Sequence, residues 1–66
     1  MKIFVNGEEH AFEAPLYVAD LLNQLGLPRT KIAVEHNLEI VVKSAYETHE
    51  LGDGDRVEIV HFIGGG

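Results

Sequence analysis

The sequence predicts one small α+β domain, in which a mixed sheet of about four to five strands packs on one main helix. Three observations lead to this fold class. The chain has 66 residues, enough for a single domain, since domains usually span roughly 50–200 residues. One segment has the apolar spacing of an amphipathic helix, whereas the others alternate as strands do. A lone helix can bury its apolar stripe by lying across one face of a sheet, which gives an α+β roll.

The N-terminal segment is expected to form a β-hairpin. The first six residues alternate as a strand does, with Ile3 on the apolar face. The Asn6-Gly7 dipeptide that follows is preferred in two-residue type I′ turns, because both central residues need a positive φ. Folding back about this turn places Ile3 opposite His10. Phe12 and Ala14 then join the apolar face of the hairpin.

The next segment, Pro15–Leu25, is predicted to be the helix. Its apolar residues follow the i, i+3, i+4, i+7 spacing of one helix face and are Val18, Leu21, Leu22 and Leu25. Gly26 is suited to end the helix, Leu27 can fold back onto the last turn, and Pro28 prevents continuation. Tyr17 stands where Ser, Thr or Asp usually caps a helix, so the N-terminal cap is expected to be weak.

The middle of the chain is predicted to return to strands. Lys31–Glu35 alternates, His36-Asn37 interrupts the pattern, and Glu39–Val42 is a short β-branched strand. Ser44–Glu47 has the S-x-x-E spacing of a capping box, which predicts a brief helical turn capped by the serine. The run of Gly and Asp over Gly52–Asp55 predicts a tight turn.

The last strand is expected to run from Arg56 to about Ile63. Alternation places Val57 and Ile59 on the core face, and the opposite face then carries Glu58, Val60 and Phe62. The first and last strands are expected to pair in parallel at the centre of the sheet, since their β-branched character suits burial. The domain is thus expected over residues 1–63, followed by a flexible glycine tail over residues 64–66.

Composition excludes several classes of function. The chain carries eleven acidic and five basic residues, a formal net charge of −6, which argues against nucleic-acid and anionic-membrane partners. It contains no cysteine, and so no disulfide, thiolate metal site or cysteine nucleophile. No apolar run approaches the roughly 20 residues of a membrane span, and no signal peptide is evident, so a cytoplasmic protein is expected. So short a chain has little room for the deep pocket of a self-sufficient enzyme.

The polar residues of the chain do not form a recognisable catalytic or metal motif. The histidines are widely spaced and are expected to be ordinary surface or sheet-edge residues rather than ligands: His10, His36, His49 and His61. Asp53-Gly54-Asp55 lacks the further ligand positions of a calcium loop and is interpreted as a hairpin turn. Neither catalysis by this chain nor a bound cofactor or metal is expected.

The C-terminal glycine run is the most informative feature of the sequence. Glycine has no Cβ, so Gly64, Gly65 and Gly66 can be drawn into a slot too narrow for side chains. A run of this kind also leaves the Gly66 carboxylate unshielded, where another protein's active site could activate it as an acyl-adenylate. The alternative is an incidental chain end, since termini are often glycine-rich and disordered.

The whole pattern resembles the ThiS/MoaD family, the ubiquitin-like β-grasp sulfur carriers. The motifs that carry the resemblance cover the entire chain: Met1–Gly7, Val18–Leu22, Ile32–Glu35, Glu39–Val41, Leu51–Ile59 and Gly65-Gly66. The length is more typical of the ThiS branch, which serves thiamine biosynthesis, than of the molybdopterin branch. Two positions depart from the family pattern, namely the Ala14–Tyr17 lead-in to the helix and the additional glycine, Gly64.

The resemblance implies a carrier that partner enzymes act on and that is not itself an enzyme. The Gly66 carboxylate would be adenylated with ATP by an E1-like partner of the ThiF or MoeB type, and a persulfide sulfur donor would convert it to a thiocarboxylate. Thiazole synthase (ThiG) would receive the sulfur for thiazole formation. ATP then belongs to the partner, and the free carrier is expected to be a monomer. Two alternatives stay open, a MoaD-like carrier for molybdopterin synthesis and a protein modifier conjugated through Gly66. A third is a plain interaction domain with an incidental tail.

A docking surface is expected next to the tail. Val60, Phe62 and Ile63 are apolar and lie at the end of the last strand, two of them off the core face. They form either a partner-binding patch or ordinary scattered surface residues. Acidic side chains could steer a basic partner or be only a solvated face, and these are Glu47, Glu50, Asp53, Asp55 and Glu58.

Overall fold

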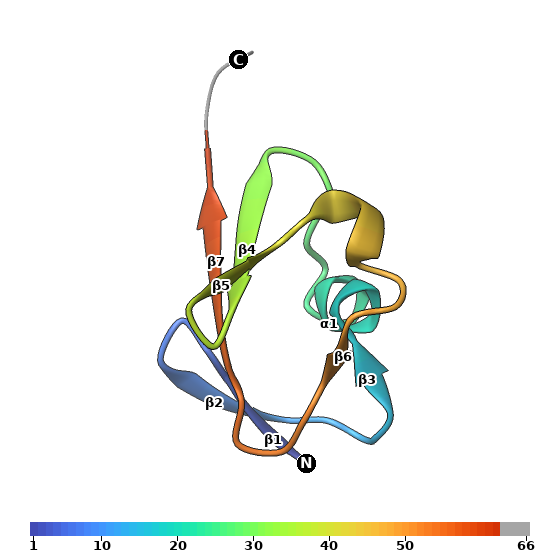
Figure 1. Cartoon of the computed structure of the whole chain (residues 1–66). Coiled ribbons are helices and arrows are strands. Elements are labelled where there is room, and N and C mark those ends of the chain that lie inside the picture. The colour runs from blue at the N-terminus through green and yellow to red at the C-terminus, as the bar shows by residue number, and fades with distance from the viewer. Residues whose placement is uncertain (63–66) are drawn as a thin grey trace.

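A five-stranded mixed sheet and one helix that lies against it make up the fold (Figure 1). Figure 1 shows the computed structural model, which describes residues 1–62. The elements in chain order are β1 (Lys2–Val5), β2 (Glu8–Ala11), β3 (Leu16–Tyr17), α1 (Val18–Gln24), β4 (Ile32–His36), β5 (Glu39–Val41), a 3-10 turn η1 (Lys43–Ala45), β6 (Glu50–Leu51) and β7 (Arg56–His61). The sheet order is β2-β1-β7-β4-β5, and β3 and β6 form a separate two-stranded pair. The predicted α+β class and strand number are confirmed.

The N-terminal hairpin has the predicted register. Ile3 lies opposite His10, and the turn residues Asn6 and Gly7 have φ values of 50° and 82°, as a type I′ turn requires. Phe12 is buried, as expected. The prediction for Ala14 is wrong, because Ala14 is exposed. β2 ends at Ala11, so the two-residue alternation no longer holds there.

The helix begins at Val18, three residues later than predicted. The preceding Leu16 and Tyr17 are extended and pair with β6, an element that the sequence did not reveal. The Asp20 carboxylate accepts the Tyr17 backbone N–H at 3.0 Å and so satisfies a donor at the helix start. At the other end, Gly26 has a φ of 70° and Leu27 N–H donates to the Leu22 carbonyl at 2.9 Å. This is the predicted glycine stop, in Schellman geometry.

The segment from β4 to η1 differs from prediction in two details. β4 continues through His36, and the chain reverses at Asn37 and Leu38, which both have positive φ. The predicted helical turn is present but begins at Lys43, and no side chain caps it. The capping role predicted for Ser44 is therefore wrong. The turn is only three residues long, so Ser44 lies inside it rather than before it.

β7 is the central strand of the sheet. It runs parallel to β1, as predicted, with Val5 beside Val57, and antiparallel to β4, with Val34 beside Ile59. Val57 and Ile59 are buried, and the intervening Glu58 is exposed. The core lies between this sheet face and α1. Its fully buried side chains are Ile3, Leu16, Leu21, Leu22, Val18, Val34 and Val57. The opposite face, here called the outer face, carries the residues that alternate with these core positions.

Candidate functional site

The C-terminal end of β7 is the structural part of the candidate site. His61 lies opposite Ile32, and the Phe62 N–H donates to the Lys31 carbonyl at 3.0 Å. The start of β4 therefore holds β7 in the sheet as far as Phe62. This end of β7 lies at the opposite end of the molecule from the turn that joins β6 to β7 (Figure 1). The C-terminal end of β7 is thus separated from that turn by the length of the strand.

Two of the three predicted docking residues are placed as expected. Val60 and Phe62 are 57% and 51% exposed, large values for apolar side chains at the end of a central strand. Val60 lies beside Ala33 of β4 on the outer face. The third residue, Ile63, lies outside the described residues. So do the predicted tail residues Gly64, Gly65 and Gly66.

The structure adds two apolar side chains to this face. Ile40 of β5 is 65% exposed, and Val42, two residues further along the chain, is 59% exposed. Their exposure follows from the burial of Val41 between them, because successive side chains of a strand point to opposite faces. The set Ile40, Val42, Val60 and Phe62 is called the outer-face patch below. Sequence reasoning missed its β5 half, although the alternation about position 41 carried the signal.

Charged side chains lie beside the outer-face patch. Glu35 of β4 pairs in register with both Ile40 and Glu58, so two carboxylates share this face. The Arg56 guanidinium, at the start of β7, lies 5.4 Å from the centre of the Phe4 ring of β1. An apolar patch flanked by carboxylates suits a partner surface with an apolar centre and basic side chains around it.

Three of the predicted steering acids have internal partners. Glu47 forms an ion pair with Arg29. Asp53 accepts the Lys2 backbone N–H at 2.7 Å and so ties the β6–β7 turn to β1. Asp55 accepts the Gly52 N–H at 2.7 Å across the same turn. Asp53 and Asp55 thus stabilise the turn before β7, whereas Glu47 forms only a surface ion pair. Glu50 and Glu58 are exposed.

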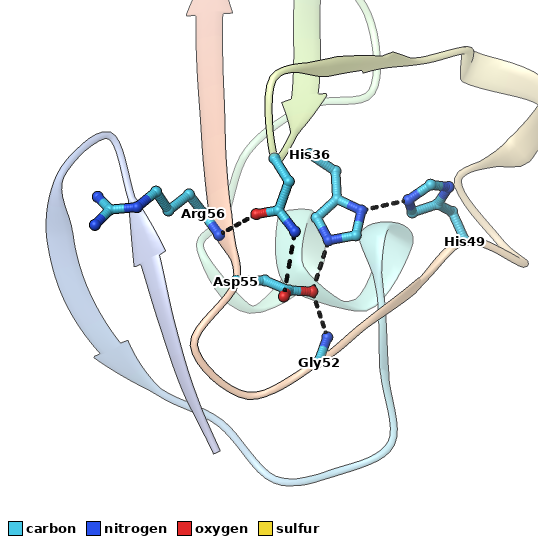
Figure 2. Close-up of polar contacts among 6 residues, drawn as sticks. His36, His49, Gly52, Asp55 and Arg56 are labelled. Atoms are coloured by element: carbon cyan, nitrogen blue, oxygen red, sulfur yellow. Dashed lines mark hydrogen bonds and ion pairs between the residues drawn. The ribbon is translucent and has the colours of Figure 1, made fainter.

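The turn before β7 also contains a polar cluster that the sequence did not predict (Figure 2). His36 Nε2 lies 2.6 Å from the Asp55 carboxylate, and His36 Nδ1 lies 2.7 Å from His49 Nε2. Partial burial alone would raise the pKa of Asp55, but the hydrogen bonds that it accepts, first of all from the Gly52 N–H, hold that pKa below its ordinary value. The predicted turn over Gly52–Asp55 is present, since the Asp55 N–H donates to the Gly52 carbonyl at 3.1 Å. The hairpin interpretation is wrong, because β6 before the turn pairs with β3, and β7 after it pairs with β1 and β4.

The expectation of ordinary surface histidines is wrong for His36 and His49, which contact each other although 13 residues apart. His10 lies on the edge strand β2 beside Glu8, as expected, and His61 is exposed. Within residues 1–62, no group of three or more potential ligands is arranged to hold a metal ion. That part of the chain also has no helix long and apolar enough to cross a membrane.

The fold and this site define a class of protein. A hairpin, a helix across one sheet face and a central last strand that leads to the C-terminus form a ubiquitin-like β-grasp domain. The sequence model of the ThiS family matches residues 2–66. The chain therefore belongs to the ThiS family.

Solved structures and curated relatives agree with this family. The crystal structure of thiamine biosynthesis protein ThiS from Geobacter metallireducens superimposes with a TM-score of 0.85, at 33% identity and over 100% of both chains. The sulfur carrier protein ThiS of Bacillus subtilis is 47% identical over 49 residues, which are 74% of each chain. The predicted β-grasp fold and family are confirmed.

Two further relatives are much longer proteins. The thiazole synthases of Paramagnetospirillum magneticum and Magnetococcus marinus are 54% and 46% identical over all 66 residues. This chain spans 20% of the length of each of these two proteins. Polypeptides of that name thus contain a segment similar to the whole chain.

Proposed function

We propose that this chain carries sulfur as a thiocarboxylate on Gly66, and that it does so as a substrate of partner enzymes rather than as an enzyme. The observation that carries the proposal is the family match, which extends to residue 66 and so includes the terminal Gly65-Gly66 pair. The proposed division is a β-grasp domain over residues 1–63 and a flexible tail over Gly64, Gly65 and Gly66.

The proposed chemistry needs three steps. The Gly66 carboxylate attacks the α-phosphorus of ATP on an E1-like partner of the ThiF or MoeB type, forming an acyl-adenylate and releasing pyrophosphate. A persulfide attacks the activated carbonyl, AMP leaves, and an acyl disulfide forms. A thiol of the partner then attacks the sulfur that belongs to the donor, the S–S bond breaks, and the thiocarboxylate leaves on Gly66 while donor and thiol form a disulfide. ATP is bound by the partner, and this chain supplies only the carboxylate.

We propose thiazole synthase (ThiG) as the acceptor of the sulfur. Support comes from the two relatives that bear this name and contain a segment similar to the whole chain. Segments that share one polypeptide are held at high effective concentration, which suits direct transfer between them. The cytoplasm, where ATP and persulfide donors are available, is the proposed compartment.

The outer-face patch is the proposed docking surface. Its two halves, Val60 with Phe62 and Ile40 with Val42, are exposed on one sheet face on either side of β4. The first half lies on and next to β7, the strand that leads to the tail. A partner that covers this patch would hold the carrier beside its own active site while the tail reaches inside. Ile63, which lies outside the described residues, is proposed as a further partner contact next to the tail.

Intact-protein mass spectrometry tests the proposed chemistry. The chain is incubated with ATP, a ThiF-type adenylyltransferase and a persulfide donor, and fragmentation locates any mass change. The expected result is one oxygen-for-sulfur exchange at Gly66. Fragmentation is needed because oxidation of Met1 gives nearly the same mass.

Two chains serve as controls in that experiment. A chain extended by one residue beyond Gly66 should show no exchange, whereas a chain extended at its N-terminus should react normally. No exchange in the unextended chain, with a partner shown to be active, would contradict the proposal. Higher-mass conjugates through Gly66 would instead indicate a protein modifier.

A further inference from the structure

The cluster at the turn before β7 forms a chain of three side chains, His49, His36 and Asp55, here called the histidine chain. The Nε2 atom of His49 lies 2.7 Å from Nδ1 of His36, and Nε2 of His36 lies 2.6 Å from the Asp55 carboxylate. The two imidazole rings meet edge to face at 90°. Figure 2 shows that the histidine chain joins the end of β4, the segment before β6 and the β6–β7 turn. These two contacts therefore link three segments that are distant in sequence.

The carboxylate fixes where the protons lie at neutral pH. Ionised Asp55 can only accept hydrogen bonds, so the facing Nε2 of His36 must carry a proton. A neutral His36 then has a bare Nδ1, which can only accept. The proton in the contact between the rings must therefore come from His49 Nε2. Every contact of the histidine chain has one donor and one acceptor.

The contact between the rings limits the number of added protons. One added proton can bind to Nδ1 of His49, which leaves the contact between the rings unchanged. Alternatively it binds to Nδ1 of His36, and His49 changes tautomer so that its Nε2 becomes the acceptor. In both cases one donor faces one acceptor. A second proton makes both rings cationic and points two N–H groups at each other across 2.7 Å. We infer that the histidine chain is a pH-sensitive clasp, closed with no or one added proton and opened by a second.

The other charged groups around the clasp leave this limit unchanged. Glu39 lies opposite His36 on β5, and Glu50 follows His49. The Arg56 side chain extends away from the rings toward Phe4, although its backbone N–H is bonded to Asn37 beside them (Figure 2). Burial raises the pKa of Tyr46, which stays neutral throughout this range. Opening removes the side-chain link between β4 and the segment before β6, whereas the His49 carbonyl still accepts the Val18 N–H at 3.0 Å.

Urea unfolding between pH 7.5 and 5.0 tests the clasp. The unfolded chain binds two protons on these rings below the ordinary histidine pKa, whereas the closed clasp binds one. The ratio of folded to unfolded protein should then fall by up to about tenfold per pH unit below pH ~6. His49→Gln should abolish this fall, because a Gln amide can donate to neutral His36 and accept from protonated His36.

A matched variant and a spectroscopic measurement complete the test. His10→Gln makes the same exchange beside Glu8, away from the histidine chain, and should retain the steep fall. Imidazole ¹⁵N shifts at pH 7.5 should show protonated Nε2 on both His36 and His49. A wild-type fall no steeper than that of His49→Gln would overturn the inference. So would a ring contact that persists at pH 5 with both rings doubly protonated. Neither outcome bears on the chemistry proposed for Gly66.

Discussion

The side chain of Asn6 forms hydrogen bonds with the backbone of β7 just beyond the end of β1. Its removal should destabilise the whole domain. Asn6 Oδ1 accepts the Ile59 N–H at 2.7 Å, and Asn6 Nδ2 donates to the Ile59 carbonyl at 3.1 Å. β1 ends at Val5, so this amide continues the pairing of the central strand by one further residue. Asn6 also has a φ of 50°, which most residues with a Cβ adopt only at a cost.

Asn6→Ala should lower the free energy of unfolding by about 3 kcal/mol. Two hydrogen bonds contribute about 1 kcal/mol each, and alanine in the left-handed region costs about 1 kcal/mol more. A core of this size rarely supplies more than about 3–5 kcal/mol. The Asn6→Ala protein should then keep only about 0–2 kcal/mol, so between roughly 3% and half of it should be unfolded at 25 °C.

Urea unfolding followed by circular dichroism measures this loss, and two further variants separate its causes. Asn6→Gly keeps the positive φ accessible but loses both hydrogen bonds, so its loss should be about 2 kcal/mol. Asn23→Ala, at an exposed helix position, should change stability by less than about 0.5 kcal/mol. The reasoning is refuted if Asn6→Ala is as stable as wild type. Equal losses for the alanine and glycine variants would refute only the cost assigned to alanine at a positive φ.

Two further predictions concern the acid limb of stability and the docking surface. The pKa of Asp55 is lower in the folded chain than its ordinary value of 3.8, so its stabilisation is complete above that value and is lost as the pH falls through the folded pKa. Asp55→Asn should accordingly be less stable than wild type at pH 5. Its free energy of unfolding, measured by urea titration, should also fall less between pH 5 and pH 2 than that of wild type. An equal fall in both proteins would contradict this. Val60→Asp should weaken binding to the adenylating partner at least tenfold in calorimetry, since truncated anchor residues often cost more than ~2 kcal/mol. Leu38→Asp is its control, because Leu38 is 86% exposed in the β4–β5 turn, outside the outer-face patch, and equal losses in both variants would count against the patch.

The sequence predicts those parts of the fold that depend on local periodicity. Alternation about Val57 and Ile59 identified the core face of β7 and, by the same rule, the exposure of Val60 and Phe62. The Asn6-Gly7 turn fixed the register of the hairpin, because a two-residue loop leaves one pairing. These features need only neighbouring residues, so they are visible before any tertiary structure is known.

The features that the sequence did not reveal arise from contacts between distant segments. β3 and β6 are two residues long and show no period, and they become strands by pairing with each other. His36 and His49 meet because two different loops converge. The sequence identified Asn6 only as a turn residue with a positive φ, yet its side-chain amide bonds to Ile59, 53 residues away. For Ser44, the S-x-x-E spacing occurs without the full helical turn that a capping box needs.

The central position of β7 has a mechanical consequence. The strand that leads to the tail is bonded to β1 on one side, through Phe4 and the Asn6 amide, and to β4 on the other. A partner that pulls on the C-terminus loads β7 along its own axis, across its hydrogen bonds. These bonds then share the load in shear and cannot be unzipped one after another. A partner can thus pull on the domain through its C-terminus while the sheet that presents the outer-face patch stays folded.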